Sequence, residues 1–189
     1  NGVQVNVSGT HDRDALNIKG TVTIKDEATK VYVSSPVEKV AQTAVNVEGF
    51  VLNGGTLETS GYEFAMYVND AKMEILAGSL KLTNAKRGIG TWGNPEMNFN
   101  GGEVVIDVTE APIWINEAGK LTINGSNVTL KGGDIDIRCR EVYIKSGVVY
   151  GECKNDAYQA PGGQPVKFEI SGGTVTFVNT TEGGNGTGI

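Results

Sequence analysis

Residues 168–177 read Phe-Glu-Ile-Ser-Gly-Gly-Thr-Val-Thr-Phe, with apolar and polar residues alternating on both sides of a Gly-Gly pair. Alternation with a period of two is typical of a half-buried β-strand, and glycine permits the positive φ that a tight corner needs. The pattern recurs upstream, beginning at Phe50, Met73, Met97, Leu121 and, in a degenerate copy, Val142. Measured at the second corner residue, the copies are 23, 24, 24, 21 and 26 residues apart. A period of this length indicates a solenoid.

Alignment of the copies places similar residues in columns. The column before the corner contains Phe50, Met73, Met97, Leu121, Val142 and Phe168. Such ladders pack well when strands stack at a spacing of about 4.8 Å. A third strand is expected near 66–68, 113–115 and 135–137. The sequence therefore predicts an all-β fold, a single right-handed, single-stranded parallel β-helix over residues 1–189, with about 24 residues per turn and about seven to eight turns.

The ends of the chain depart from this pattern. We expect irregular N-terminal turns over residues 1–43, regular turns over 44–178 and a flexible tail over 179–189. Ser35-Pro36-Val37-Glu38 has the form of a capping box with proline at the first helical position, which predicts a short helix over 36–43. No capping helix follows Phe177, so the open end predicts contact with a further domain or end-to-end contact.

Composition limits the partners. The net charge is −6 and the 16 Lys and Arg residues are scattered, which argues against nucleic acid. No apolar run is long enough to insert into a membrane. Cys139 and Cys153 are 14 residues apart, at different positions of the repeat. We expect two buried free thiols, with a disulfide as the alternative.

Enzymes with this architecture set one expectation. A hydrolase needs converging carboxylates, and a lyase needs calcium beside an arginine or lysine that accepts a proton. The single histidine, His11, is expected at the surface, and no long loops between Gly55 and Gly147 could wall a groove. The sequence predicts that the protein is not an enzyme, and a lyase-like activity is the third hypothesis.

Acidic residues form one candidate site. Glu110 and Asp134 occupy the same position of successive repeats, and Asp136 is nearby. Such carboxylates, together with turn carbonyls, could bind Ca²⁺, which prefers six to eight oxygen ligands. The alternative is a solvated acidic edge balanced by Arg138 and Arg140.

Aromatic residues form the other candidate site. Tyr67 and Trp114 share a repeat position, two turns apart, on the outward parity, and Trp92 lies two residues beyond the intervening Gly90. Tyr143 and Tyr150 point outward on either side of the Ser146-Gly147 corner. Aromatic faces stack on sugars, so these five residues are candidate carbohydrate-binding residues. The alternative is burial in the core; it is balanced against exposure for Trp114, and for Trp92 we expect burial or partial shielding.

The repeated wording Ile-Ser-Gly-Gly-Thr-Val-Thr-Phe at 170–177 and Leu-Asn-Gly-Gly-Thr-Leu-Glu-Thr at 52–59, with Gly88-Ile89 and Gly188-Ile189, resembles a bacterial family. This family comprises the secreted or surface β-helix proteins of clostridia and gut anaerobes that are described as carbohydrate-binding domain-containing. The resemblance implies a small, non-catalytic, pectin lyase-like β-helix that binds plant polysaccharide such as pectin, in some members with calcium. Family turns usually read acidic-Gly-Ile, whereas Arg87 and Thr187 precede Gly-Ile here, which argues against calcium at those turns.

Together these observations predict a non-catalytic module of an extracellular or cell-surface bacterial protein that binds plant or host polysaccharide. The alternative is a structural spacer or adhesin solenoid with no ligand of its own. Exposed, roughly coplanar rings at Tyr67, Trp114, Tyr143 and Tyr150 would favour binding, and buried rings would favour the spacer.

Overall fold

The computed structural model describes residues 2–9, 13–35, 40–69, 72–115, 118–162 and 166–181. Within these ranges the chain forms strands and turns only, so they contain no helix that could cross a membrane. The strands are β1 (Gln4–Ser8), β2 (Leu16–Ile24), β3 (Lys30–Ser34), β4 (Val40–Ser60), β5 (Tyr62–Asn69), β6 (Lys72–Trp92), β7 (Glu96–Phe99), β8 (Glu103–Ile115), β9 (Lys120–Lys131), β10 (Ile135–Arg138), β11 (Glu141–Cys153), β12 (Asp156–Gln159), β13 (Lys167–Ile170) and β14 (Thr174–Asn179).

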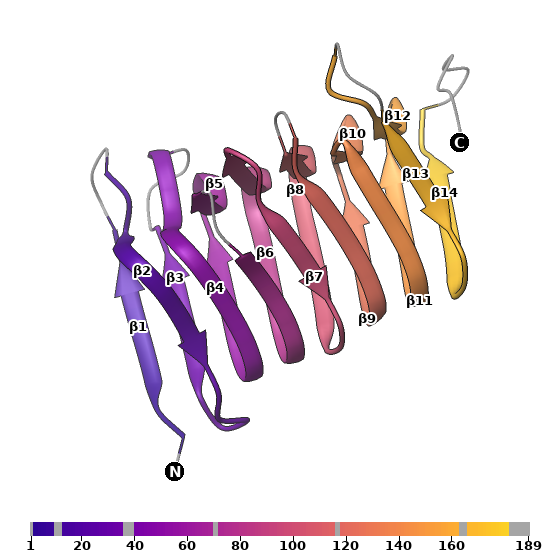
Figure 1. The fold of residues 1–189 in the computed structure, drawn as a ribbon. Coiled ribbons are helices and arrows are strands. Elements are labelled where there is room, and N and C mark those ends of the chain that lie inside the picture. Colours follow the sequence, from indigo (N-terminus) through magenta and orange to yellow (C-terminus); the bar gives the residue numbers. More distant parts are fainter. Residues whose placement is uncertain are drawn as a thin grey trace.

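These strands wind into a coil of about seven turns (Figure 1). Pairing between successive turns is parallel throughout, as it is between β6 and β8 and between β9 and β11. The predicted parallel β-helix is confirmed. Long strands such as β4 and β6 bend at the corners and contribute to more than one side of the coil.

The coil has three sides, which we define by their paired residues. The first side stacks 50–52, 73–75, 97–99, 121–123, 142–144 and 168–170. The second side stacks 57–59, 80–82, 104–106, 128–130, 149–151 and 175–177. The third side stacks 45–47, 66–68, 89–91, 113–115 and then β10 and β12. The register deduced from the Gly-Gly pattern is therefore the register of the structure.

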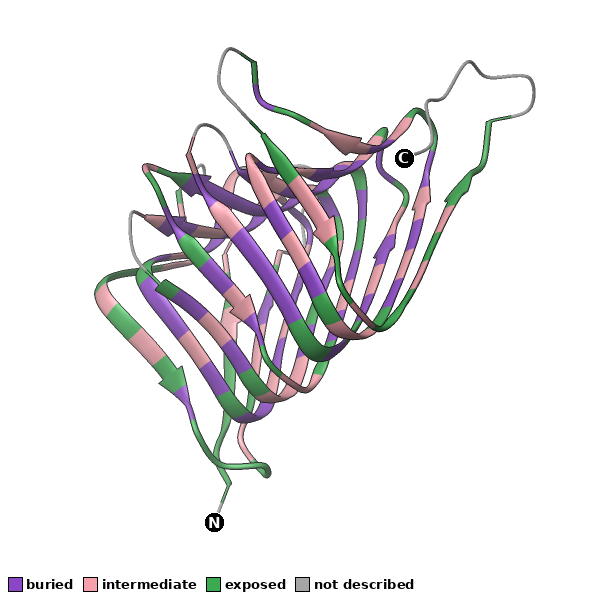
Figure 2. Ribbon diagram, turned by 45° about the vertical axis from the view of Figure 1, so that its right-hand side comes forward, coloured by how far each residue is buried: buried purple, intermediate pink, exposed green. Residues whose placement is uncertain are grey.

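The core follows the predicted ladders. Phe50, Met73, Met97, Leu121 and Val142 are completely buried, whereas Phe168 in the last turn is only partly buried. Figure 2 shows burial alternating along the strands and exposure increasing in the terminal turns. Burial of apolar side chains contributes about 25 cal/mol per Å², and a terminal turn has only one neighbouring turn against which to pack.

The corners need glycine for a geometric reason. Gly55, Gly78 and Gly102 have φ values of 67°, 90° and 73°. A Cβ on Gly78 would lie 2.5 Å from the Gly55 carbonyl oxygen, because the corner backbones of successive turns stack directly. At the variant corner the positive φ belongs to Gly125, at 105°, one residue before Ser126. A side chain at these corners would combine a collision with a strained backbone.

The predicted helix over 36–43 is wrong where it can be checked. Residues 36–39 lie outside the described ranges, and Val40 begins β4, so residues 40–43 are strand. In β4, Val40 pairs with Tyr62 and Thr43 with Phe64 of the next turn. Stacking on the neighbouring turn outweighs the local capping signal, because helix propensity is a weak preference.

The two ends differ from expectation in degree. Strands β1 and β2 each stack on a later strand, β3 and β4 respectively, so the N-terminal 43 residues include ordered turns of the solenoid. At the other end β14 extends to Asn179, and residues 182–189 of the predicted tail lie outside the described ranges, as does His11.

Candidate functional site

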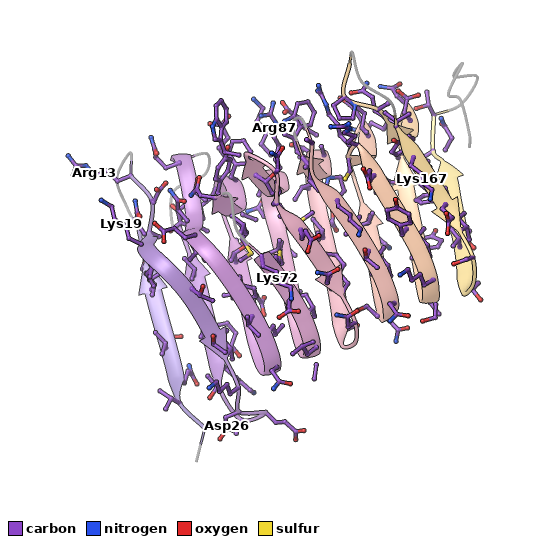
Figure 3. The ribbon with its side chains drawn as sticks, viewed as in Figure 1. Arg13, Lys19, Asp26, Lys72, Arg87 and Lys167 are labelled. Atoms are coloured by element: carbon purple, nitrogen blue, oxygen red, sulfur yellow. The ribbon has the colours of Figure 1, made fainter. Side chains whose placement is uncertain are left out.

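The outer face of the third side contains most of the candidate aromatic residues. Its outward column runs Tyr67, Gly90, Trp114 and Arg138 in consecutive turns. The predicted two-turn separation of Tyr67 and Trp114 is therefore confirmed. Figure 3 shows rings and basic side chains along this edge, around Arg87.

An arginine from each neighbouring turn lies over the ring of Trp114. The Arg87 guanidinium carbon lies 4.4 Å from the centroid of its ring, and the Arg138 guanidinium carbon lies 4.2 Å from it. The Arg87 guanidinium carbon is also 5.2 Å from the centroid of the Phe64 ring, and Arg87 Nε donates a hydrogen bond to Glu110 at 3.0 Å. Guanidinium groups stack favourably on indole. In this arrangement a sugar that approached the Trp114 ring would meet arginine side chains from both neighbouring turns.

Tyr67 has a different environment. Its ring packs edge-to-face on Phe64, with centroids 5.5 Å apart and planes at 86°. The pair borders an open groove of about 330 Å³. The groove is lined by Asp14, Gln42, Thr43, Asn46, Glu63, Phe64, Tyr67 and Asn69. Partial burial raises the pKa of the Tyr67 hydroxyl, which keeps it protonated and able to donate.

Gly90 makes the position of this aromatic pair possible. A Cβ at Gly90 would lie 2.8 Å from Cδ1 of Phe64 and 2.9 Å from Cδ2 of Tyr67. The two rings therefore lean over the glycine of the next turn. Because Gly90 has no side chain, the rings of Phe64 and Tyr67 can occupy the space above its backbone, in the turn between Tyr67 and Trp114.

Hydrogen-bonded side chains form the polar wall of the groove. Asn69 Nδ2 donates to Asn46 Oδ1 at 2.6 Å, and Asn46 Nδ2 donates to Asp14 Oδ2 at 2.7 Å. Asp14 also accepts from Asn17 Nδ2 at 3.2 Å and from the Thr43 amide at 3.2 Å. These bonds join three successive turns and hold the amides in fixed orientations.

Trp92 lies beside this wall. Its backbone pairs with that of Asn69, and its side chain is 66% exposed. The expectation that Trp92 is buried or partly shielded is wrong. The residue ends β6 on the outward parity, and a side chain there leaves the packed surface at a corner.

Tyr143 and Tyr150 point outward as predicted, but on the first and second sides. Lys120 and Lys167 lie 5.3 and 4.8 Å from the Tyr143 ring centroid. The Tyr143 hydroxyl donates to Glu141 and that of Tyr150 to Glu152, which raises the pKa of each phenol. The structure therefore does not bring these tyrosines together with Tyr67 or Trp114 in one plane.

The three acidic candidates do not converge. The Asp134 amide donates to the Glu110 carbonyl at 2.7 Å, so these residues are neighbours in successive turns, as predicted. Both Glu110 carboxylate oxygens are engaged, with Lys86 at 3.1 Å and Arg87 at 3.0 Å. No group of three or more potential ligands occurs in the part of the chain that is described.

Asp136 corrects the sequence interpretation most clearly. It was expected on an outward acidic edge, yet it is completely buried, and neither carboxylate oxygen makes a hydrogen bond of regular geometry with the residues that the structure describes. Alternation breaks at the bend into the third side, where Ala111, Pro112 and Ile113 of the preceding turn are also buried in succession. Gly151 provides the space, since a Cβ there would lie 2.3 Å from Asp136 Oδ2.

Burial controls the ionisation of this interior cluster. Loss of solvent raises the pKa of Asp136 to about 7, with the Cys153 thiol lowering it and the Glu152 charge raising it further. Cys139 and Cys153 are buried free thiols, as predicted. Burial raises their pKa values to about 12 and about 11. The thiols are therefore protonated at neutral pH and poorly nucleophilic.

Several residues of the groove were missed from the sequence. Phe64 belongs to the same strand as Tyr67, and Asn46 and Asn69 are 23 residues apart, close to one repeat. The repeat spacing could have identified the two asparagines as outward neighbours. Asp14 carried no signal, because it precedes the first regular turn.

Comparisons with protein-family models, with curated proteins and with solved structures find no match to this chain.

Proposed function

We propose that the protein is a non-catalytic carbohydrate-binding module, and that the groove beside Tyr67 is its binding site. The observation that carries the proposal is the combination of an open groove of about 330 Å³, an exposed Trp92 and hydrogen-bonded amides along one wall. Sugars offer apolar ring faces for aromatic side chains and hydroxyls for amides and carboxylates, so the groove supplies both kinds of contact.

Among the five aromatic candidates, the proposal assigns different roles. Tyr67 and Trp92 contact the ligand. Trp114 stabilises the third side, because Arg87 and Arg138 cover it. Tyr143 and Tyr150 lie on other sides of the coil and are outside the proposed site.

The cellular setting is part of the same proposal. We place the module in an extracellular or cell-surface bacterial protein, where a rigid coil would present the groove to a polysaccharide. Support comes from the family resemblance of the repeated Gly-Gly corner sequence and from the polar outer surface of the strands.

Affinity electrophoresis tests the assignment. Gels would contain xylan, glucomannan, hydroxyethylcellulose or polygalacturonate, and mobility would be compared with that in a gel lacking polysaccharide. We expect retardation of the wild type in at least one gel and a loss of affinity of about tenfold or more for Trp92→Ala and for Tyr67→Ala, the effect typical of central aromatic contacts.

Tyr32→Ala provides the matched control, because this tyrosine lies on the second side, in register with Asn6 and Glu58. Its mobility should equal that of the wild type. Absence of retardation in every gel would reject the proposal and favour the structural spacer. Incubation with polygalacturonate, followed by absorbance of unsaturated products, would detect a lyase.

A further inference from the structure

In the chain of amides along the groove wall, the donors are engaged within the protein and an acceptor is left over. Asn69 Nδ2 donates to Asn46 Oδ1 at 2.6 Å and makes a longer contact of 3.5 Å with the Val47 carbonyl. An amide nitrogen has two hydrogens, so the donors of Asn69 are committed to the protein. Its Oδ1 receives no hydrogen bond from the residues that the structure describes.

Asp14 determines this direction. An ionised carboxylate only accepts hydrogen bonds, so Asn46 must turn its Nδ2 toward Asp14. The Asn46 Oδ1 then faces Asn69 and accepts from it. The Asn69 Oδ1 consequently becomes the free acceptor at the end of the chain of amides.

The charges in the groove have one sign. Asp14 and Glu63 are among the described residues that line it, and none of those described lining residues is a lysine or an arginine. Lys86 lies 3.7 Å from Glu63, and it is shared with Glu110, which is closer at 3.1 Å. The chain as a whole carries a net charge of −6. A ligand carboxylate or sulfate in this groove would meet like charges, which disfavour binding.

We propose that the groove selects neutral sugars whose hydroxyls donate to Asn69, Asp14 and Glu63, and that it rejects uronate and sulfated glycans. The inference rests on the proposed carbohydrate-binding function and specifies the ligand class for the same site. Asp14 acts as a positioning residue for the amide chain as well as an acceptor.

The first test compares ligand classes for the wild-type protein. Affinity gels would contain glucomannan, galactomannan or hydroxyethylcellulose as neutral polymers, and polygalacturonate or carrageenan as anionic ones, in 150 mM NaCl with EDTA. We expect retardation by a neutral polymer and none by an anionic polymer. Stronger retardation by polygalacturonate or carrageenan would overturn this inference and leave the carbohydrate-binding function standing. Lack of retardation in all gels would overturn both.

The second test uses Asp14→Asn, which preserves side-chain shape and removes the charge. We expect about fivefold weaker binding of the neutral polymer, from loss of one oriented acceptor, together with newly measurable retardation by polygalacturonate. The second readout separates orientation and charge from a general structural defect, which would weaken all binding. Unchanged exclusion of polygalacturonate alongside unchanged neutral binding would contradict the role of Asp14.

Two variants complete the design. Asp107→Asn removes an exposed carboxylate from the second side and should change neither affinity nor selectivity. Asn69→Ala removes the terminal acceptor without changing charge, so it should weaken neutral binding about fivefold and still exclude polygalacturonate. Thermal unfolding of each variant verifies that the coil is intact. Full retention of neutral binding by Asn69→Ala would contradict the proposed acceptor.

Discussion

Tyr67 and Trp114 occupy the same column of the same face, two turns apart, yet their surroundings are opposite. Tyr67 borders an open groove with Phe64 and a row of amides. Trp114 has two guanidinium groups over its ring, one from each neighbouring turn. Equivalent positions in a repeat therefore need not have equivalent surroundings. The residues one turn away, Gly90 beside the Tyr67 ring and Arg138 beside the Trp114 ring, determine what lies against each ring.

The interior beneath these two regions differs as well. Under the groove the core is apolar, with Met66 and Val68 fully buried. Under the Trp114 region, β10 contributes the buried Asp136, accommodated by Gly151. The groove region thus combines a polar surface with an apolar core. The Trp114 region instead has arginine-covered indole at the surface and the ionisable Asp136 in the core.

The largest predicted effect concerns Asp136 and pH. Its pKa is about 7 in the folded protein and 3.8 when unperturbed, so the folded state retains a proton that the unfolded state releases between these values. The contribution of Asp136 to the free energy of unfolding is therefore greatest below pH 4, and this contribution falls as the pH rises to 7. The difference of about 3 units corresponds to at most about 4 kcal/mol.

Asp136→Asn should remove this pH dependence. Urea unfolding at pH 4, 5.5, 7 and 8 should show the stability of the variant rising relative to wild type by a few kcal/mol from pH 4 to 7, then staying level. Asp134→Asn, an exposed neighbour on the same segment, is the control and should follow the wild type. A constant difference between Asp136→Asn and wild type would show that Asp136 does not titrate as described.

A smaller effect distinguishes the two tryptophans. Trp114→Ala removes two cation–π contacts worth about 0.5–2 kcal/mol each, so unfolding should become easier by about 2 kcal/mol. Glycan affinity should stay unchanged. Trp92→Ala should have the reverse pattern, with stability within about 0.5 kcal/mol of wild type and weakened binding. Denaturant midpoints and affinity gels on both variants measure this contrast, and matching losses would contradict it.

The smallest predicted effect is at Gly90. Gly90→Ala places a methyl group against Phe64 and Tyr67, and these partly exposed rings can move aside. We expect a stability change below about 1 kcal/mol and about fivefold weaker glycan binding, equivalent to about 1 kcal/mol. Gly162→Ala is the control, because a Cβ there meets nothing within 4 Å. Unaltered affinity would show that the ring positions do not determine binding.

The outward candidates show how far sequence reasoning extends to the site. Parity correctly placed Tyr67, Trp114, Tyr143 and Tyr150 outside the core, and the period correctly placed Glu110 beside Asp134. Parity could not show that Arg87 and Arg138 cover Trp114, because a long side chain reaches over a neighbouring turn. It also misplaced Asp136, because alternation does not continue through a bend.

The amino-acid sequence alone determined the parallel coil, its register and the inward ladders, because each turn repeats the same apolar positions and the same glycine corner. The tertiary structure decided which outward residues form a groove, which ring is closed and where a carboxyl group enters the core. Those outcomes depend on contacts between side chains in different turns. Such contacts are set by side-chain length and by local gaps such as Gly90 and Gly151, which a repeat period does not encode.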